Sequence, residues 1–316
     1  LLKSMELPDS LATIGECAFS GCTVLTSITV SEANENYKSV DGNLYSKDGK
    51  TFIQYAMGKA DTTFTVPEGV TRIGDYAFFG CASLTSIDLP DSLTTIGNYA
   101  FSDFTSLTSI VIPEGVTTIG YGAFRYCESL TIYCEVAEKP DGWSDSWNQS
   151  GCRVAWGCQV TGDGFVYETT NNSVSIQGYI GLDNNVVIPT VIDGKNVTTI
   201  GDRAFHSCPS LTNIVIPKGV SAIGDSAFSW CTSLKSIELP DSLTAIGDDA
   251  FYCCELLASI VIPKGVTAIG EYAFYKCTSL TSIVIPEGVT TMGDSAFRNC
   301  TSLTSIVISE GVTAIG

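Results

Sequence analysis

Histidine is almost absent from this chain, which has one histidine among 316 residues. His206 occupies a repeat position that other copies fill with Phe79, Arg125 and Tyr252, so we interpret it as an exposed, variable position. A Cys-His nucleophile with Cys208 would require a thiol activated by its neighbours. Cys208 belongs instead to a recurring apolar position. We therefore expect no catalytic residue and no enzyme activity.

Patterns that hold metals, phosphates or cofactors are also lacking. The sequence has no Cys-x-x-Cys pair of the kind that zinc sites use. Asp163-Gly164 and the Asp183–Asn185 stretch lack the ligand spacing of a calcium loop. No glycine-rich loop follows a strand and opens a helix. We expect no metal and no cofactor.

Basic residues are scarce and long apolar runs are missing. The 16 Lys and Arg are outnumbered by 34 Asp and Glu, which gives a formal net charge of -18. Such a field repels nucleic acid and anionic headgroups. No run reaches the ~18–20 apolar residues of a membrane span, and no signal peptide is visible. We expect no nucleic-acid partner and no direct membrane insertion, with most acidic side chains serving as a solvated surface.

The sequence does contain a repeat of about 23 residues, which predicts a solenoid. Its period is marked by prolines at positions 67, 90, 113, 217, 240, 263 and 286. In the copy from Leu280 to Pro286, Ile283 and Ile285 alternate with outward positions, as in a strand that the proline ends. Stacked copies would pair their strands in parallel and share one core. The chain starts and stops in mid-repeat, so we expect both ends to cut through an array.

The second half of each repeat predicts its own local structure. Val289 and Met292 are expected to point inward from a second short strand. The recurring glycine, as at Gly293, predicts a positive φ or a tight corner. The Ala-Phe-x-x-Cys segment that follows predicts one helical or 3₁₀ turn. Its phenylalanine, at the same phase in nine copies, predicts a common buried position.

The 13 cysteines are mostly explained by the repeat. Eight share one position, four residues after the alanine: Cys22, Cys81, Cys127, Cys208, Cys231, Cys254, Cys277 and Cys300. Parallel side chains on stacked turns do not meet disulfide geometry, so we predict buried free thiols that act as small apolar groups. The sequence leaves open whether Cys134 and Cys152 pair.

Breaks in the period predict two domains. Residues 1–157 form a first array with a hairpin insertion (31–66), in which two β runs flank Lys47–Lys50, and a tryptophan-rich C-terminal cap (132–157). Residues 158–316 form a second array with a β-hairpin at its start (163–192), truncated at its C-terminus. The tryptophans of the 132–157 segment are either a ligand-binding aromatic patch or a cover for the open end of the first array.

The repeat Ile-Val-Ile-Pro-Glu-Gly-Val-Thr-x-Ile-Gly-x-x-Ala-Phe-x-x-Cys-x-Ser-Leu-Thr-Ser resembles the BspA-type leucine-rich repeat. The Asp163 hairpin and the Trp143–Trp156 stretch resemble the start and end of arrays in that family. The resemblance implies a secreted or cell-surface bacterial protein that adheres to host matrix proteins, other microbes or epithelium, and it carries no catalytic residues.

We therefore predict a mainly β leucine-rich-repeat solenoid with parallel strands, short helical turns and β-hairpin interruptions. Its expected function is extracellular recognition or adhesion, with a protein as partner. The outward strand positions and exposed aromatics are the candidate partner-binding residues: Asp88, Val111, Val215, Glu238, Val261, Val284, Trp230, Tyr252 and Tyr275. Two alternatives stay open, a carbohydrate-binding module that uses Trp143 and Trp147, and a structural spacer for another domain.

Overall fold

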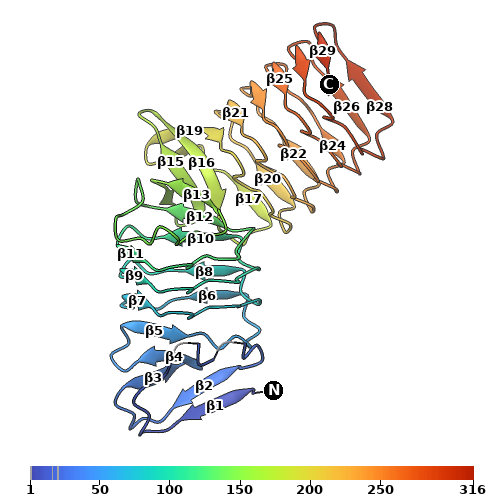
Figure 1. The fold of residues 1–316 in the computed structure, drawn as a ribbon. Helices are drawn as coiled ribbons and strands as arrows, with labels where there is room; N and C mark the ends of the chain where they lie inside the picture. The colour runs from blue at the N-terminus through green and yellow to red at the C-terminus, as the bar shows by residue number, and fades with distance from the viewer. Residues whose placement is uncertain (1, 16, 20) are drawn as a thin grey trace. The chain divides into compact units, whose positions relative to one another are not determined.

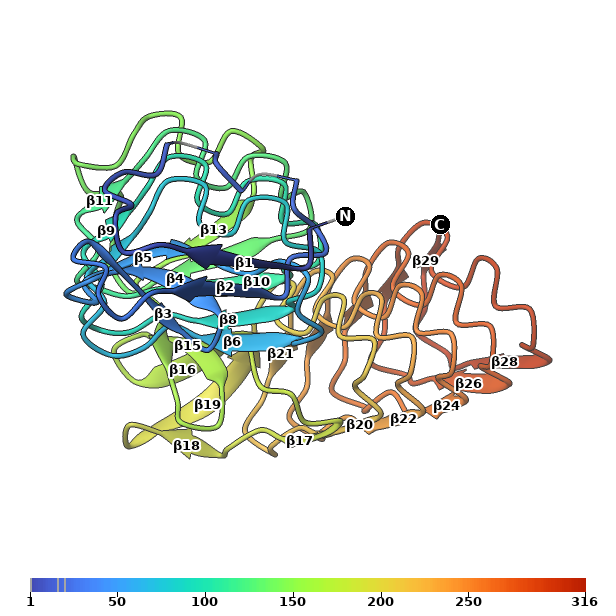
Figure 2. The same cartoon turned by 90° about the horizontal axis from the view of Figure 1, so that it is seen from below.

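The structure is a computed structural model that describes residues 2–15, 17–19 and 21–316. The chain divides into two compact units, residues 1–158 and 159–316, and each is described by itself. All regular elements within the described ranges are β-strands. In both units the chain winds as stacked coils (Figures 1 and 2), which confirms the predicted leucine-rich-repeat solenoid. That each unit folds as an independent domain stays a prediction.

The first unit is built from short strands in successive coils. They are β1 (Ser4–Leu7), β2 (Ser27–Val30), β3 (Tyr37–Val40), β4 (Asn43–Ser46), β5 (Thr51–Gln54), β6 (Thr63–Thr65), β7 (Arg72–Ile73), β8 (Ser86–Asp88), β9 (Thr95–Ile96), β10 (Ser109–Ile112), β11 (Thr118–Ile119), β12 (Thr131–Cys134) and β13 (Arg153–Trp156). The sheet orders are β1-β2, β6-β8, β10-β12-β13 and β11-β9-β7-β5-β4-β3.

The second unit repeats this plan. Its strands are β14 (Gln159–Val160), β15 (Phe165–Thr169), β16 (Ser173–Tyr179), β17 (Asn185–Val187), β18 (Val191–Ile192), β19 (Lys195–Ile200), β20 (Asn213–Val215), β21 (Ala222–Ile223), β22 (Ser236–Glu238), β23 (Ala245–Ile246), β24 (Ser259–Ile260), β25 (Ala268–Ile269), β26 (Ser282–Ile285), β27 (Thr291–Met292), β28 (Ser305–Ile308) and β29 (Ala314–Ile315). The sheet orders are β14-β15-β16-β19-β21-β23-β25-β27-β29, with β18 on β19, then β17-β20-β22-β24 and β26-β28.

Parallel pairing advances by one 23-residue repeat per coil, as in the pairing of Ile223 with Ile246 and of Ile246 with Ile269. The side chains expected inside are inside: Ile283, Ile285, Val289 and Met292 are all buried. Because no single coil can bury both of its apolar edges, stacking is what creates the core. In the second unit that core is one continuous cluster that runs from the hairpin at its start to the last coils.

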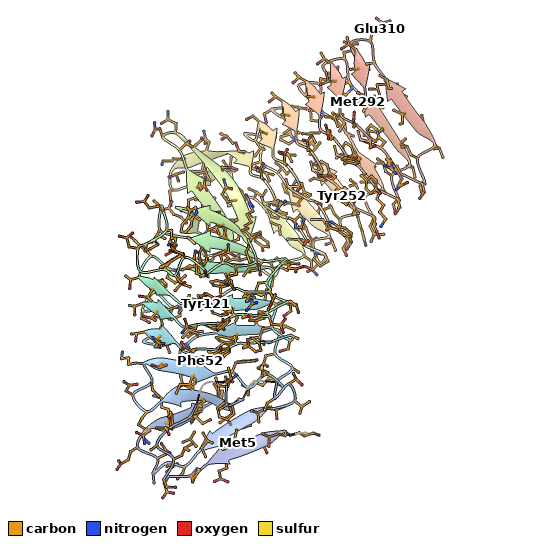
Figure 3. The ribbon with its side chains drawn as sticks, viewed as in Figure 1. Met5, Phe52, Tyr121, Tyr252, Met292 and Glu310 are labelled. Atoms are coloured by element: carbon orange, nitrogen blue, oxygen red, sulfur yellow. The ribbon has the colours of Figure 1, made fainter. Side chains whose placement is uncertain are left out.

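A column of stacked phenylalanine rings forms the centre of each core, as the repeat predicts. Phe205, Phe228, Phe251 and Phe274 are fully buried, and successive ring centroids lie 5.3 to 5.4 Å apart with nearly parallel planes. In Figure 3 the labelled Phe52 marks the start of the matching column in the first unit, where its ring stacks on that of Phe78 at 4.8 Å.

The Ala-Phe segment is not helical, so the predicted helical turn is wrong. In each coil two residues four positions apart take positive φ, as at Asp249 (54°) and Cys253 (56°). Alternate amides bond to the next coil, as in the 2.8 Å bond that the Phe251 amide donates to Ala273 O, while those between them close tight turns, as from Cys254 to Phe251 O at 3.2 Å. A helix would use every amide within its own segment. Because alternate amides of this segment donate to the next coil, they are not free to form a helix, and the segment adopts consecutive turns instead.

The recurring glycine is required for close stacking, so of the two predicted reasons for it the tight corner is confirmed and the positive φ is not. Gly247 is not among the positive-φ glycines. A Cβ at Gly247 would lie 2.7 Å from the backbone nitrogen of Asp225 and 2.7 Å from the carbonyl carbon of Gly224, both in the preceding coil. Adjacent coils therefore approach too closely at this corner for any side chain.

The cysteine column is confirmed as free thiols directed at the core. Five of its eight members are fully buried, and all are free. Four of the five buried thiols donate to a carbonyl in the preceding coil, as where Cys254 Sγ donates to Phe228 O at 3.2 Å. Cys134 and Cys152 are both free, and Cys152 Sγ donates to Cys127 O at 3.1 Å. The open question of their pairing is thus resolved against a disulfide.

The predicted hairpins are present. β4 and β5 are antiparallel around Lys47–Lys50, and β15 and β16 are antiparallel at the start of the second array. β4 also separates two cores, because Leu44 belongs to a small N-terminal cluster and Tyr45 to the main cluster of the first unit.

Candidate partner-binding surfaces

Apolar side chains form an outward column on one strand side of the second unit. We call this the valine column. It consists of five valines, with Glu238 in place of a valine at one position: Val187, Val215, Glu238, Val261, Val284 and Val307. Val187 pairs in register with Val215, Val215 with Glu238, and Val284 with Val307. All five valines are exposed, and Val261 shows the largest exposed fraction, 79%. Exposing a row of apolar side chains to water is unfavourable, so such a row is typical of a surface that a partner covers.

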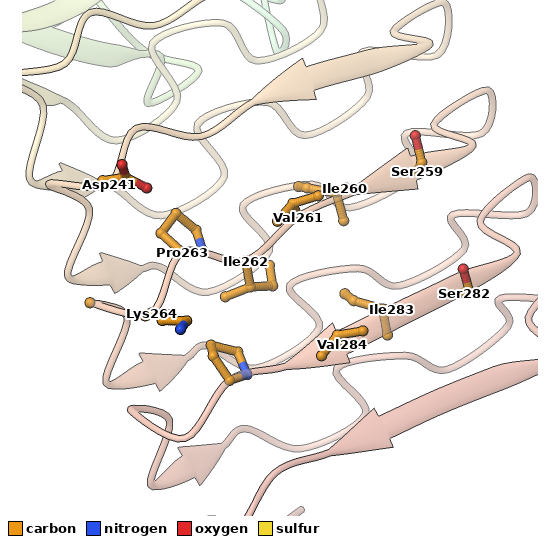
Figure 4. Close-up of a pocket in the computed structure, with 12 residues that line it drawn as sticks. Asp241, Ser259, Ile260, Val261, Ile262, Pro263, Lys264, Ser282, Ile283 and Val284 are labelled. Atoms are coloured by element: carbon orange, nitrogen blue, oxygen red, sulfur yellow. The ribbon is translucent and has the colours of Figure 1, made fainter.

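A groove crosses this column at Val261 and Val284. It has a volume of about 760 Å³, and its walls include Ile260, Ile262 and Pro263 (Figure 4). The two valines lie side by side on adjacent coils in the close-up, with Lys264 and Asp241 towards the turn end. The groove lies where the parallel sheet is interrupted: among the described residues, β24 pairs only with β22 and β26 only with β28.

The first unit offers less apolar surface at the equivalent positions. Asp88 is exposed and polar, while Val111 is only half exposed. Val111 pairs in register with Tyr133, which is buried, and Tyr133 pairs with Ala155, also buried. The valine column is therefore a feature of the second unit, and Val111 is a weaker candidate than its three counterparts there.

Trp143 and Trp147 do not form a surface patch, which corrects the carbohydrate-binding interpretation. Trp143 is 2% exposed, and its Nε1 donates to Val116 O at 3.0 Å. Its ring packs edge-on against Trp147 at 4.9 Å, and Trp147 packs edge-on against Phe124 at 5.8 Å. The indole faces that a sugar ring would stack on are occupied by the end of the first array. This packing agrees with the alternative interpretation of the segment as a cover.

The remaining aromatic candidates lie together on the side of the second unit formed by the Ala-Phe segments. Trp230 is exposed, and its ring centroid lies 5.9 Å from that of Tyr252. Tyr252 stacks on Tyr275 at 4.6 Å with an interplanar angle of 10°, and Tyr272 meets Tyr275 edge-on at 5.8 Å. We call these four side chains the aromatic row. Its rings pack along the stacking direction, with Trp230 exposed and the three tyrosines partly exposed.

The buried thiols are unsuited to nucleophilic chemistry. Burial raises the pKa of the Cys208 thiol to about 11 and that of Cys127 to about 12. At neutral pH these groups are therefore protonated, whereas the thiolate is the reactive form. His206 is exposed. Within the described ranges, no group of three or more His, Cys, Asp or Glu side chains is arranged to hold a metal ion. Nor does any helix there have the length and apolar character to cross a membrane.

Sequence reasoning did not place Val187 in the valine column. Val187 precedes Ile188-Pro189 in the irregular start of the second array, where the 23-residue period fails. The motif Val-Ile-Pro recurs at Val215–Pro217, and this local match was the signal that aligns Val187 with the column. The groove carried no comparable signal in the sequence.

Comparisons with known proteins match the repeat region of this chain. A family model described as the BspA type leucine rich repeat region matches six copies over residues 1–48, 55–135 and 198–316. A leucine rich cell surface protein from Faecalibacterium prausnitzii is 31% identical, with a TM-score of 0.50, covering 98% of this chain and 79% of its own. A search of curated proteins finds no match.

Two further solved structures are similar to this chain. A leucine rich repeat protein from T. pallidum is 39% identical over 47% of this chain and 70% of its own, with a TM-score of 0.45. The pneumococcal vaccine antigen PcpA is 20% identical over 98% of this chain and 69% of its own, with a TM-score of 0.48.

Proposed function

Because the chain belongs to the BspA-type leucine-rich repeat family, we propose that it is a non-enzymatic recognition protein of the bacterial surface that adheres to a protein partner through the valine column. A partner protein on a host matrix or on another microbe is the occupant that fits. The relative from F. prausnitzii is described as a cell surface protein.

One observation carries the proposal, the row of exposed valines with a groove at Val261 and Val284. Burying one valine side chain releases about 1.5–3 kcal/mol, so two adjacent valines supply a central apolar contact. Glu238 interrupts the row, and Lys264 and Asp241 lie at the groove, so charged groups surround the apolar centre. An apolar core within a polar rim is the usual anatomy of a protein–protein interface.

Replacing Val261 and Val284 together by lysine tests the proposal. Both side chains point into solvent, so the double variant is expected to fold and to lose binding by at least about a hundredfold, since two charges would enter the apolar centre. Surface plasmon resonance against a panel of purified host matrix proteins, together with adherence of labelled protein to bacterial and epithelial cells, provides the measurement.

Val40→Lys is the matched control, because Val40 is an exposed strand valine in the first unit. It is expected to retain full binding. Equal binding by wild type and the Val261→Lys/Val284→Lys variant would place the contact elsewhere. Binding to glycans alone would contradict a protein partner and favour a carbohydrate-binding function instead.

A further inference from the structure

A second surface of the second unit combines charge with aromatic rings. It lies on the Ala-Phe segments, away from the valine column, and so goes beyond the function proposed above. Acidic side chains follow the recurring glycine in five successive coils, and the first four of them are Asp202, Asp225, Asp248 and Glu271. We call these four the carboxylate column. All four are exposed.

The carboxylate column is held in place by the backbone. Asp225 N donates to Asp202 Oδ1 at 2.9 Å, Asp248 N to Asp225 Oδ1 at 2.8 Å, and Glu271 N to Asp248 Oδ1 at 2.7 Å. Each of the three aspartates thus has one oxygen fixed by the next coil. None of the four carboxylates has a basic side chain within ion-pair distance among the described residues, and the column is a row of uncompensated negative charge.

Asp249 joins this column to the aromatic row. Burial first, and then the charges of Asp248 and Asp225, raise the pKa of the Asp249 carboxyl, with Arg203 acting in the opposite direction. Burial raises the pKa of the Tyr252 hydroxyl, with smaller contributions from Cys253, Tyr275 and Asp249, whereas the charge of Lys276 lowers it. Asp249 directly follows Asp248, the Tyr252 amide donates to Asp249 O at 2.9 Å, and the Trp230 amide donates to Tyr252 O at 2.8 Å. The carboxylate column and the aromatic row therefore adjoin one another, with Arg203 and Lys276 as neighbouring positive charges.

We infer that this surface is a docking site for an arginine- and lysine-rich segment of a partner protein. Charge complementarity selects the occupant, because a basic side chain can neutralise the carboxylate column while its apolar stem or guanidinium plane lies against the rings. Arginine suits the site better than lysine, since its planar group stacks on an indole and donates to a carboxylate at once. Asn299, which donates to the Tyr275 hydroxyl at 3.0 Å, closes the row at its far end.

The first unit contains the natural comparison. There Tyr76 stacks on Tyr99 at 5.0 Å, and Tyr99 meets Tyr121 at 5.5 Å. The positions that would form a carboxylate column hold Asp75, Asn98 and Tyr121, and Asp75 is paired with Arg72 at 3.1 Å. This surface has the rings without the free charges, and it should not attract a basic segment.

Binding of a short peptide that alternates arginine and serine, at about 0.15 M salt, tests the inference. Fluorescence anisotropy of the labelled peptide is expected to show saturable binding to the full chain, weaker binding of the lysine analogue and none of the glutamate analogue. Tyr252→Ala and Asp249→Asn should each weaken the arginine peptide by about tenfold. Asn is chosen at 249 because it tolerates the positive φ there.

Two controls separate this site from general attraction to an acidic chain. Tyr121→Ala removes an exposed ring from the first unit, and Asp88→Asn removes one exposed charge. Both should leave the affinity within about twofold, as should Val261→Lys/Val284→Lys, which lies on the strand side. Equal weakening by Asp88→Asn and Asp249→Asn, or no binding of the arginine peptide, would overturn the inference. Circular dichroism melting curves show whether each variant is folded, and Asp249→Asn keeps the test decisive should Tyr252→Ala unfold.

Discussion

At the scale of single residues, repetition decides what each side chain can do. The same thiol, ring or carboxylate lies beside its own copy in the next coil. The properties of one side chain are therefore repeated along a column. The cysteine column shows the benign case, because a neutral thiol donates to a carbonyl and packs as an apolar group. The carboxylate column shows the opposite case, because identical negative charges are held on adjacent coils.

Asp249 allows a test of that electrostatic cost. Its pKa is raised in the folded chain by burial and by Asp248 and Asp225. For a carboxyl group with a raised folded pKa, the stabilisation is fully present below the ordinary pKa and is lost as the pH rises through the folded value. Asp249→Asn cannot ionise, so it should melt roughly 1–3 °C above wild type at pH 7, with the difference vanishing near pH 3.

Thermal melting of both proteins at the two pH values measures this difference, and Asp88→Asn controls for the loss of one charge from a chain of net charge -18. A variant no more stable than wild type at pH 7 would show that Arg203 fully compensates the neighbouring carboxylates.

At the scale of elements, the coil is set by how closely its neighbours approach. Gly247→Ala would place a Cβ 2.7 Å from backbone atoms of Asp225 and Gly224, which cannot rotate away. Overpacking of this kind is expected to lower the free energy of unfolding by about 1–3 kcal/mol. Gly162→Ala is the matched control, since a Cβ there meets nothing within 4 Å and its φ is not positive. Urea denaturation compares the two, and equal stability of both variants would contradict the stacking explanation.

Most of each element was predictable from the repeat. Alternating positions identified the buried strand residues, such as Ile283 and Ile285, because only one face of the strand meets the core. The turns were not predictable, because Ala-Phe-x-x-Cys has no local preference for positive φ. Residues such as Trp230 adopt it only because the next coil takes alternate amides. The groove was also beyond the sequence, since Ser259–Pro263 and Ser282–Pro286 are identical, yet the strands there differ in length.

At the scale of the whole molecule, the two units have separate cores. Every sheet in the described ranges lies within one unit, and the hydrophobic clusters divide in the same way. Repeats contact only their neighbours in a solenoid, so cooperativity extends as far as stacking is continuous. We therefore expect the units to unfold in separate steps rather than in one two-state transition.

Tryptophan positions make this separation measurable in the intact chain. Trp143, Trp147 and Trp156 lie in the first unit and only Trp230 in the second, so fluorescence reports chiefly on the first. Phe101→Ala and Phe251→Ala remove equivalent buried rings from the first and second unit, each at a cost of about 3–5 kcal/mol. The fluorescence transition in urea should move with Phe101→Ala and stay in place with Phe251→Ala. Circular dichroism should respond to both variants, because strands of both units contribute to it. If Phe251→Ala shifted the fluorescence transition as far as Phe101→Ala does, the units would be unfolding as one cooperative array.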